Sequence, residues 1–288
     1  MDVLDSLLMS LLTPMVLAFI LGVIASLVKS DLKIPPEIYT AMTIYLLFAI
    51  GLKGGANLDG VTFAALAAHY GSVSAVTFGE ALAFLQFADV PYEPYVAALL
   101  AVMEVPAIIL AIFLVGKATI TAGGGSMKKV LHELLTSKSI VLLMGGMAIG
   151  LLAGKQGAEQ VAPLFEDPFR GVLTLFLLEI GLVTGRRLGD LRHAGWRLVA
   201  FGIVMPFLHG ILGVTLGYWS GMGVGGSTIL GTLAASASYI AAPAAVRVAL
   251  PAASPAIYLT SSLAVTFPFN VVVGIPLYFS FARWLIPS

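Results

Sequence analysis

The sequence has little or none of several features on which soluble enzymes and nucleic-acid-binding proteins depend. It contains no cysteine, which excludes disulfide bonds, thiolate metal sites and cysteine nucleophiles. Only 10% of its 288 residues are charged, whereas about a quarter of the residues of a soluble domain are charged. The 15 basic and 15 acidic residues balance, so neither a basic nucleic-acid-binding surface nor an acidic disordered tail is expected. Hydrophobic residues make up 59% of the chain, which predicts a protein embedded in lipid.

Long apolar runs divide the chain into nine candidate membrane-spanning helices. Their lengths are close to the roughly 20 residues that an α-helix needs to cross the hydrocarbon core, and the pattern lacks the alternation typical of barrel strands. We therefore predict an all-α polytopic membrane protein. The expected spans are residues 7–28, 35–52, 63–87, 94–115, 139–153, 169–183, 196–219, 226–250 and 257–286. A polar cytoplasmic linker, 119–138, separates a first transmembrane repeat, 1–118, from a second, 139–288.

Three short patterns recur in the same order on the two sides of the linker. Residues 50–54 and 180–185 both begin with Ile-Gly-Leu, and the small residues of 67–74 resemble those of 234–239. Each half then has a proline-led hairpin before its last span. Repeated halves that meet at a central site are typical of transporters. The halves differ in one respect, because the span at 196–219 has no counterpart in the first half.

The distribution of charge bears on the topology. The lysines of the linker and the arginines at 186–197 are expected on the cytoplasmic side, and the acidic loop at 89–93 on the outer side. With four spans before the linker, Lys29 and Lys33 would lie outside, against the positive-inside rule. One additional helix near residues 58–60 would place them inside. We therefore predict inverted repeats from which the third helix of the first half is absent, and a natural nine-helix arrangement is the alternative.

Four blocks carry a resemblance to a known family. They are residues 103–107 (Met-Glu-Val-Pro-Ala), 166–171 (Glu-Asp-Pro-Phe-Arg-Gly), 181–191 and 234–251. In order and content they resemble the cyanobacterial-type sodium-dependent bicarbonate transporter family and its bacterial relatives. The resemblance implies a multi-pass protein of the bacterial inner membrane with two inverted five-helix repeats, of which this chain has four plus five helices. It also implies a homotrimer and a cytoplasmic face that a soluble PII-like regulator can bind. Tyr239 departs from the pattern, because the family has an acidic residue after this serine run.

Two segments of small residues interrupt apolar spans at corresponding positions of the two halves. A broken helix exposes amide N–H groups, which favour an anion at a half-helix N-terminus, and carbonyl oxygens, which can bind Na⁺. Two opposed half-helix N-termini would offset one negative charge without a lysine or arginine. The predicted anion-binding residues are Gly71, Ser72, Ser74, Ser236, Ala237 and Ser238. A packing surface between helices is the structural alternative.

Acidic residues within spans are the candidate cation sites, because a carboxylate in the membrane is costly and often functional. Glu104 precedes Pro106, which frees backbone carbonyl groups, and it could serve as a sodium ligand, a proton carrier or a structural acceptor. The residues predicted for sodium binding or coupling are Glu104, Thr77, Ser261 and Ser262. Glu80 and Glu179 are further candidates, with an ion pair to Arg247 as the structural alternative.

The repeated halves predict a secondary active transporter, and the family resemblance implies that it couples Na⁺ to the uptake of bicarbonate or a similar small anion. No hydrolase or zinc-protease motif is found, so no enzyme activity is expected, and no cofactor is expected other than Na⁺ as the coupling ion. The expected partners are a small inorganic anion and the lipid bilayer, without nucleic acid. The alternative function is a proton-coupled or Na⁺/H⁺-exchanging transporter of another small weak acid or ion. Asn270 is expected to satisfy backbone groups that Pro268 leaves free.

Overall fold

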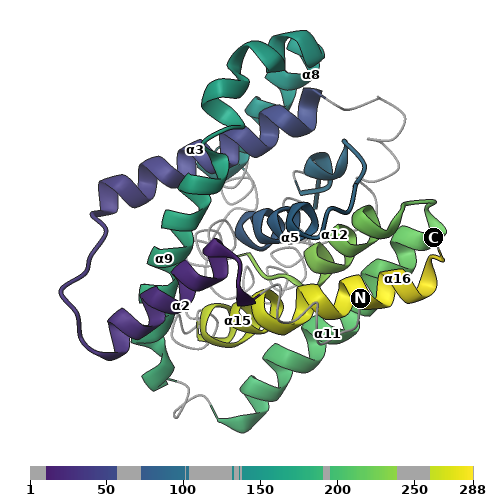
Figure 1. Ribbon diagram of the computed structural model, residues 1–288. Coiled ribbons are helices and arrows are strands. Elements are labelled where there is room, and N and C mark those ends of the chain that lie inside the picture. Colours follow the sequence, from purple (N-terminus) through teal and green to yellow (C-terminus); the bar gives the residue numbers. More distant parts are fainter. Residues whose placement is uncertain are drawn as a thin grey trace, which may run out of the picture.

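The computed structural model describes residues 11–56, 73–100, 102–103, 132, 136, 138–190, 195–238 and 260–287. The secondary structure in these ranges is entirely helical, which confirms the all-α prediction for the described part of the chain (Figure 1). The predicted position of the absent helix, residues 58–60, lies outside the described residues. Glu104, Tyr239 and Arg247 also lie outside them.

The described helices of the first half begin where the sequence supplies a cap or a proline. α2 (Pro14–Leu27) follows Thr13, whose side chain accepts a hydrogen bond from the backbone N–H of Val16. α3 (Pro36–Ala56) begins with a proline, whose missing N–H costs nothing at that position. α5 (Ala75–Phe87) follows Ser74, which caps it through the backbone N–H of Thr77. The predicted span 63–87 therefore starts its described helix only after the small-residue segment.

The helices of the second half are α8 (Lys138–Phe165), α9 (Phe169–Arg187), α11 (Trp196–Trp219) and α12 (Val224–Ala235), with a short turn, η1 (Leu188–Asp190), after α9. Gly154 interrupts α8 with a φ of 63°, a value that glycine adopts without strain. The predicted span therefore ends at residue 153 as expected. Residues 155–165, which lie outside the nine predicted spans, then form a further helical segment.

The last span is a continuous helical rod that contains two π-helical segments. Its parts are η2 (Thr260–Thr266), α15 (Phe267–Phe269), η3 (Asn270–Gly274) and α16 (Ile275–Leu285). Three helices in the described part are long and apolar enough to cross a membrane: Val141–Phe165, Trp196–Trp219 and Ser261–Leu285. Large apolar side chains such as Leu21, Phe201 and Leu212 are exposed on the outside of the helices, as expected for surfaces in contact with lipid.

The helices form two packed groups. In the first group, α2 packs against α9 and α3 packs against α8. In the second group, α12 packs against α11, α16 and α5, and aromatic residues such as Phe84 and Phe279 fill the space between them. In the first group α2 and α9 run parallel, because Phe19 faces Gly181 and Ser26, further along α2, faces Gly185, further along α9.

Candidate functional site at the interrupted helices

The two predicted interruptions meet in the structure. Ser74 has an extended backbone immediately before α5, and Ser236 has an extended backbone immediately after α12. The backbone N–H of Ser74 donates a hydrogen bond of 2.9 Å to Oγ of Ser236. We call the described residues of the two interruptions, 73–74 and 236–238, the junction. The described start of α5 and the described end of α12 thus lie against one another at the predicted serines.

The geometry of α5 and α12 brings groups of opposite partial charge to the junction. The two helices run antiparallel, since Ser74 and Ser236 meet at one end and Glu93, after α5, accepts a hydrogen bond from Gly223, before α12, at the other. The positive N-terminal end of α5 and the negative C-terminal end of α12 therefore both face the junction. Of the two opposed N-termini expected from the sequence, α5 supplies one, and the other would follow Ser238, outside the described residues.

The serine hydroxyls hold the ends of these helices. Oγ of Ser74, which is only 2% exposed, accepts a hydrogen bond of 3.1 Å from the backbone N–H of Thr77. Oγ of Ser236 donates to the carbonyl oxygen of Leu233 at 2.8 Å while it accepts from Ser74. A serine hydroxyl has one donor and two acceptor sites. Ser74 therefore keeps its O–H donor for another partner, whereas Ser236 uses its donor within its own helix and links the two spans as an acceptor.

Asn270 joins the junction from the last span, a role that the sequence did not reveal. Its side chain is fully buried, and Nδ2 donates a hydrogen bond of 2.8 Å to the carbonyl oxygen of Ala235, the last residue of α12. The expectation that Asn270 satisfies backbone freed by Pro268 was therefore wrong, because the terminal carbonyl of a different helix takes this hydrogen bond. The Tyr278 hydroxyl lies 3.1 Å from both Oδ1 of Asn270 and the carbonyl oxygen of Pro206. The signal in the sequence was an amide residue in an apolar span with a tyrosine eight residues later.

The predicted site residues fall into three sets. The structure places Ser74, Ser236, Ala237 and Ser238 in the junction, and Thr77 in the first turn of α5. Ser261 and Ser262 belong to η2, which packs against α9 and α11, whereas the following segment η3, with Asn270, packs against α5 and α12. Gly71, Ser72 and Glu104 lie outside the described residues. Asn270 is thus a residue of the last span that the structure brings to the junction.

Glu80 is a buried carboxylate on the same helix as Ser74. Its side chain is 1% exposed, and Oε1 accepts a hydrogen bond of 3.2 Å from the hydroxyl of Thr13 in front of α2. Oε2 is buried and has no hydrogen-bond partner in the described part of the chain. Six residues separate Glu80 from Ser74, a rise of about 9 Å along an α-helix. An ionisable group therefore lies within two turns of the junction.

Comparison with known protein families identifies a match over most of the chain. The sequence model of the Na⁺-dependent bicarbonate transporter superfamily matches residues 14–64 and 56–283. The two matched segments overlap at residues 56–64, around the position where the sequence predicts an absent helix. A comparison with curated proteins finds no match.

Proposed function

Because the chain belongs to the Na⁺-dependent bicarbonate transporter superfamily, we propose that it couples the inward movement of Na⁺ to the uptake of bicarbonate or a similar small anion. Membership of this family makes the protein a membrane transporter and not an enzyme. The substrate, the direction of transport and the binding residues are our proposal. They rest on the contact of the two interrupted spans.

The single observation that carries the proposal is the hydrogen bond from Ser74 N–H to Ser236 Oγ. It joins a helix N-terminus, whose partial positive charge attracts an anion, to a helix C-terminus, whose carbonyl groups attract a cation. None of the described junction residues carries a permanent charge, so binding of the anion would stay weak enough to allow release. A Na⁺ ion bound beside the anion would then strengthen its binding in the low dielectric of the site. Such mutual dependence is what couples two ions.

The proposed architecture is a pair of inverted repeats, residues 1–118 and 139–288, joined by the linker 119–138. If nine spans simply alternated in direction, the first and the sixth would run antiparallel. α2 and α9 belong to these two spans and run parallel. One additional crossing between them, as in a family pattern with a third helix in the first half, would account for this. The division of the family match at residues 56–64 supports the same position for the missing helix.

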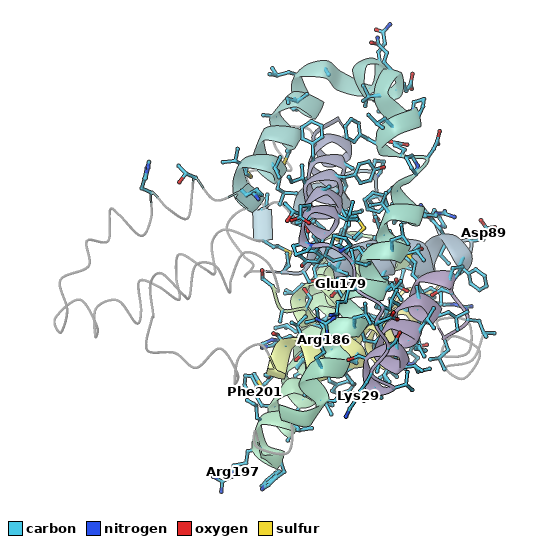
Figure 2. The ribbon with its side chains drawn as sticks, turned by 90° about the vertical axis from the view of Figure 1, so that its left-hand side faces the viewer. Lys29, Asp89, Glu179, Arg186, Arg197 and Phe201 are labelled. Carbon is cyan, nitrogen blue, oxygen red and sulfur yellow. The ribbon has the colours of Figure 1, made fainter. Side chains whose placement is uncertain are left out.

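The positions of charged side chains also support inverted repeats. Lys29, after α2, lies toward the same end of the molecule as Arg186 and Arg197, and Asp89, after α5, lies away from them (Figure 2). The positive-inside rule would place the end with the basic residues in the cytoplasm. In this orientation the loop that contains Asp89 would face outward, as the sequence predicts. We further infer, from family membership alone, a homotrimer in the bacterial inner membrane and a PII-like regulator on its cytoplasmic face.

The direct test is uptake of radiolabelled bicarbonate into proteoliposomes that contain the purified protein. We expect an inward Na⁺ gradient to drive uptake, and replacement of Na⁺ by choline to abolish it. Glu104→Gln should reduce Na⁺-dependent uptake more than folding, because glutamine keeps the size but cannot offer a charge to a cation. Uptake that is the same with Na⁺ and with choline would contradict the proposed coupling.

A second candidate function is proton-coupled transport of a small weak acid, and the burial of Glu80 favours it. The same proteoliposomes distinguish the two functions, because a proton gradient would then drive uptake in the absence of Na⁺. Formate and acetate as competitors would show whether the site accepts other small carboxylates. Stimulation by Na⁺ alone would exclude this second function.

A further inference from the structure

Glu80 lies where its negative charge has no compensating partner among the described residues. The elements packed against α5 include α9, α12 and η3, and α16 contacts it through Phe279 against Phe84. Thr13 in front of α2 is a further contact, and Arg283 of α16 lies over the ring of Phe279. The sequences of α2, α12 and η3 contain no ionisable residue. In the loop after α5, Glu93 is itself acidic and binds the backbone N–H of Gly223. The surroundings of Glu80 therefore provide one hydroxyl hydrogen bond and no cation in the described part of the chain.

The ionisable residues of α9 are engaged elsewhere. Arg170, at the outer end of α9, donates a hydrogen bond to the side chain of Gln86 on α5. Gln86 is six residues beyond Glu80, which corresponds to about 9 Å along the helix. Arg186 and Arg187 occupy the opposite end of α9, two turns beyond Glu179. Arg170 is thus paired with the amide of Gln86. One carboxylate oxygen of Glu80 has no hydrogen-bond partner among the described residues.

Glu179 provides a comparison within the same protein. It also has a buried oxygen without a hydrogen-bond partner in the described part of the chain. However, Arg186 is seven residues later, about two turns along the same face of α9, and its positive charge attracts the carboxylate of Glu179. The backbone N–H of Ile34 also faces Glu179. Glu179 therefore has a basic side chain and a backbone N–H nearby, whereas the described surroundings of Glu80 offer one hydroxyl.

We propose that Glu80, together with the hydroxyl of Thr13, binds one monovalent cation, Na⁺ or a proton, which moves with the transported anion. This inference rests on the proposed function and assigns a residue to its coupling step. An isolated carboxylate is strongly disfavoured in a medium of low dielectric, and a bound cation removes that penalty. Thr13 already donates a hydrogen bond to the carboxylate of Glu80, so its oxygen lies beside a cation that Glu80 binds.

The position of Glu80 links this cation to the anion site. Ser74 and Glu80 lie on the same short helix, α5, so a displacement of α5 moves both. Thr13 belongs to the group of helices that contains α2 and α9, on the other side of the contact. If the two groups shift against one another during transport, as in alternating access, Glu80 must leave the Thr13 hydroxyl. A cation bound to Glu80 neutralises the carboxylate and so permits this movement. Without the cation, the movement would leave a buried negative charge without a hydrogen-bond donor, which opposes it.

The experiment compares Glu80→Gln with Glu80→Asp, and uses Glu179→Gln as a matched control. Glutamine keeps an oxygen acceptor for Thr13 and the size of the side chain, but it cannot bind a cation as a carboxylate does. The readout is the number of positive charges that move with each bicarbonate, obtained from the membrane potential at which net uptake by proteoliposomes stops. We expect this number to fall by one in Glu80→Gln, to be unchanged in Glu80→Asp, and to be unchanged in Glu179→Gln.

The identity of the cation, Na⁺ or a proton, follows from the gradients that still drive uptake by the variant. If the cation is Na⁺, Glu80→Gln transports one Na⁺ fewer per bicarbonate. NaCl then also raises the melting temperature of this variant in detergent, relative to choline chloride, by less than it raises that of the wild type. If the cation is a proton, stabilisation by NaCl is retained and a pH gradient no longer drives uptake in Glu80→Gln. A charge number and responses to both gradients equal to those of the wild type would overturn the proposal and leave Glu80 as a packing residue.

Failure of this inference is distinguishable from failure of the proposed function. If the wild-type protein does not transport bicarbonate, the proposed function fails. The melting temperatures of wild type and Glu80→Gln in NaCl and choline chloride, at acidic and alkaline pH, then still test the site. Equal responses of the two proteins to Na⁺ and to pH would overturn it. Glu80→Asp retains the carboxylate, so loss of the Na⁺ and pH responses in a folded Glu80→Asp variant would also overturn it.

Discussion

Small residues have opposite roles in two regions of this protein. Between α2 and α9, Gly22, Gly181 and Gly185 allow the backbones of two uninterrupted helices to touch, and we call these three residues the glycine contact. At the junction, Ser74 and Ser236 lie where two helices end. The backbone groups of the glycine contact remain hydrogen-bonded within their helices. Those of the junction must find other partners, which include a serine hydroxyl and the amide of Asn270.

The difference shows why composition alone leaves the role of a small residue open. Both regions are rich in glycine, alanine and serine, and a packing surface was the structural alternative for the junction residues. What separates them is whether the helix continues. Where it continues, a small side chain permits close approach and nothing polar is released. Where it ends, the same small side chain leaves N–H and C=O groups accessible to an ion.

The largest expected effect comes from filling the glycine contact. A Cβ atom added to Gly181 would clash with the backbone oxygen of Phe19, so α2 and α9 would have to separate. We expect Gly181→Leu to destabilise the protein by about 3 kcal/mol or more, as in severely overpacked cores, and to lower the yield of folded protein in detergent. The matched control is Gly171→Ala on the same helix, where a Cβ would meet nothing within 4 Å. Equal melting temperatures for the two variants would show that the contact is not tightly packed.

The second effect tests the end of α12 at the junction. Asn270→Asp replaces the amide donor with a carboxylate oxygen that faces the carbonyl oxygen of Ala235, so attraction becomes repulsion. The loss of a buried hydrogen bond and the burial of an unpaired acceptor together predict destabilisation by at least about 2 kcal/mol, with a strong loss of uptake. Asn270→Ala removes the donor without adding repulsion and should be intermediate. If Asn270→Asp keeps the wild-type affinity for bicarbonate, the end of α12 does not contribute to the site.

The third effect separates anion binding from packing. Ser236→Ala removes the acceptor of the Ser74 N–H and should raise the half-saturation concentration for bicarbonate roughly two- to tenfold, since a net hydrogen bond contributes about 0.5–1.5 kcal/mol. The double variant with Ser74→Ala should raise it further and leave the oligomer intact. Ser280→Ala is the control, because the Ser280 hydroxyl bonds only a carbonyl of its own helix, that of Pro276, in the described structure. A double variant with unaltered half-saturation would make these serines packing residues.

The sequence predicted those parts of the fold that depend on local signals. The span at 196–219 coincides with α11, and the span that begins at 169 coincides with the start of α9. α5 begins and α12 ends at the predicted serines. Apolar run lengths, prolines and capping residues determine such boundaries within a few neighbouring residues. The helix at 155–165 was missed because it is short and contains charged residues and Pro163, which favour a loop.

The parts of the site that escaped prediction depend on contacts between residues far apart in the chain. Asn270 binds a carbonyl group 35 residues away, and Glu80 binds a hydroxyl 67 residues away. No local pattern reveals such partners. The assignment of Ser261 and Ser262 to the sodium site stays a prediction. The following π-helical segment with Asn270 packs against α5 and α12, and no local pattern in the sequence indicated this contact.

The smallest expected effect concerns Tyr278, whose hydroxyl contacts the side chain of Asn270. Tyr278→Phe removes a hydroxyl that lies 3.1 Å from Oδ1 of Asn270 and from the carbonyl of Pro206, and the fully buried ring stays in place. A hydroxyl donates only one hydrogen bond, so the variant loses one donor to two alternative acceptors. We expect destabilisation of about 0.5–1.5 kcal/mol and a slight rise in half-saturation, because Asn270 keeps its bond to Ala235 but gains rotational freedom. If Tyr278→Phe impaired uptake as strongly as Asn270→Asp, the hydroxyl itself would have to act at the junction, and the site would extend to the turn of α16 that carries it.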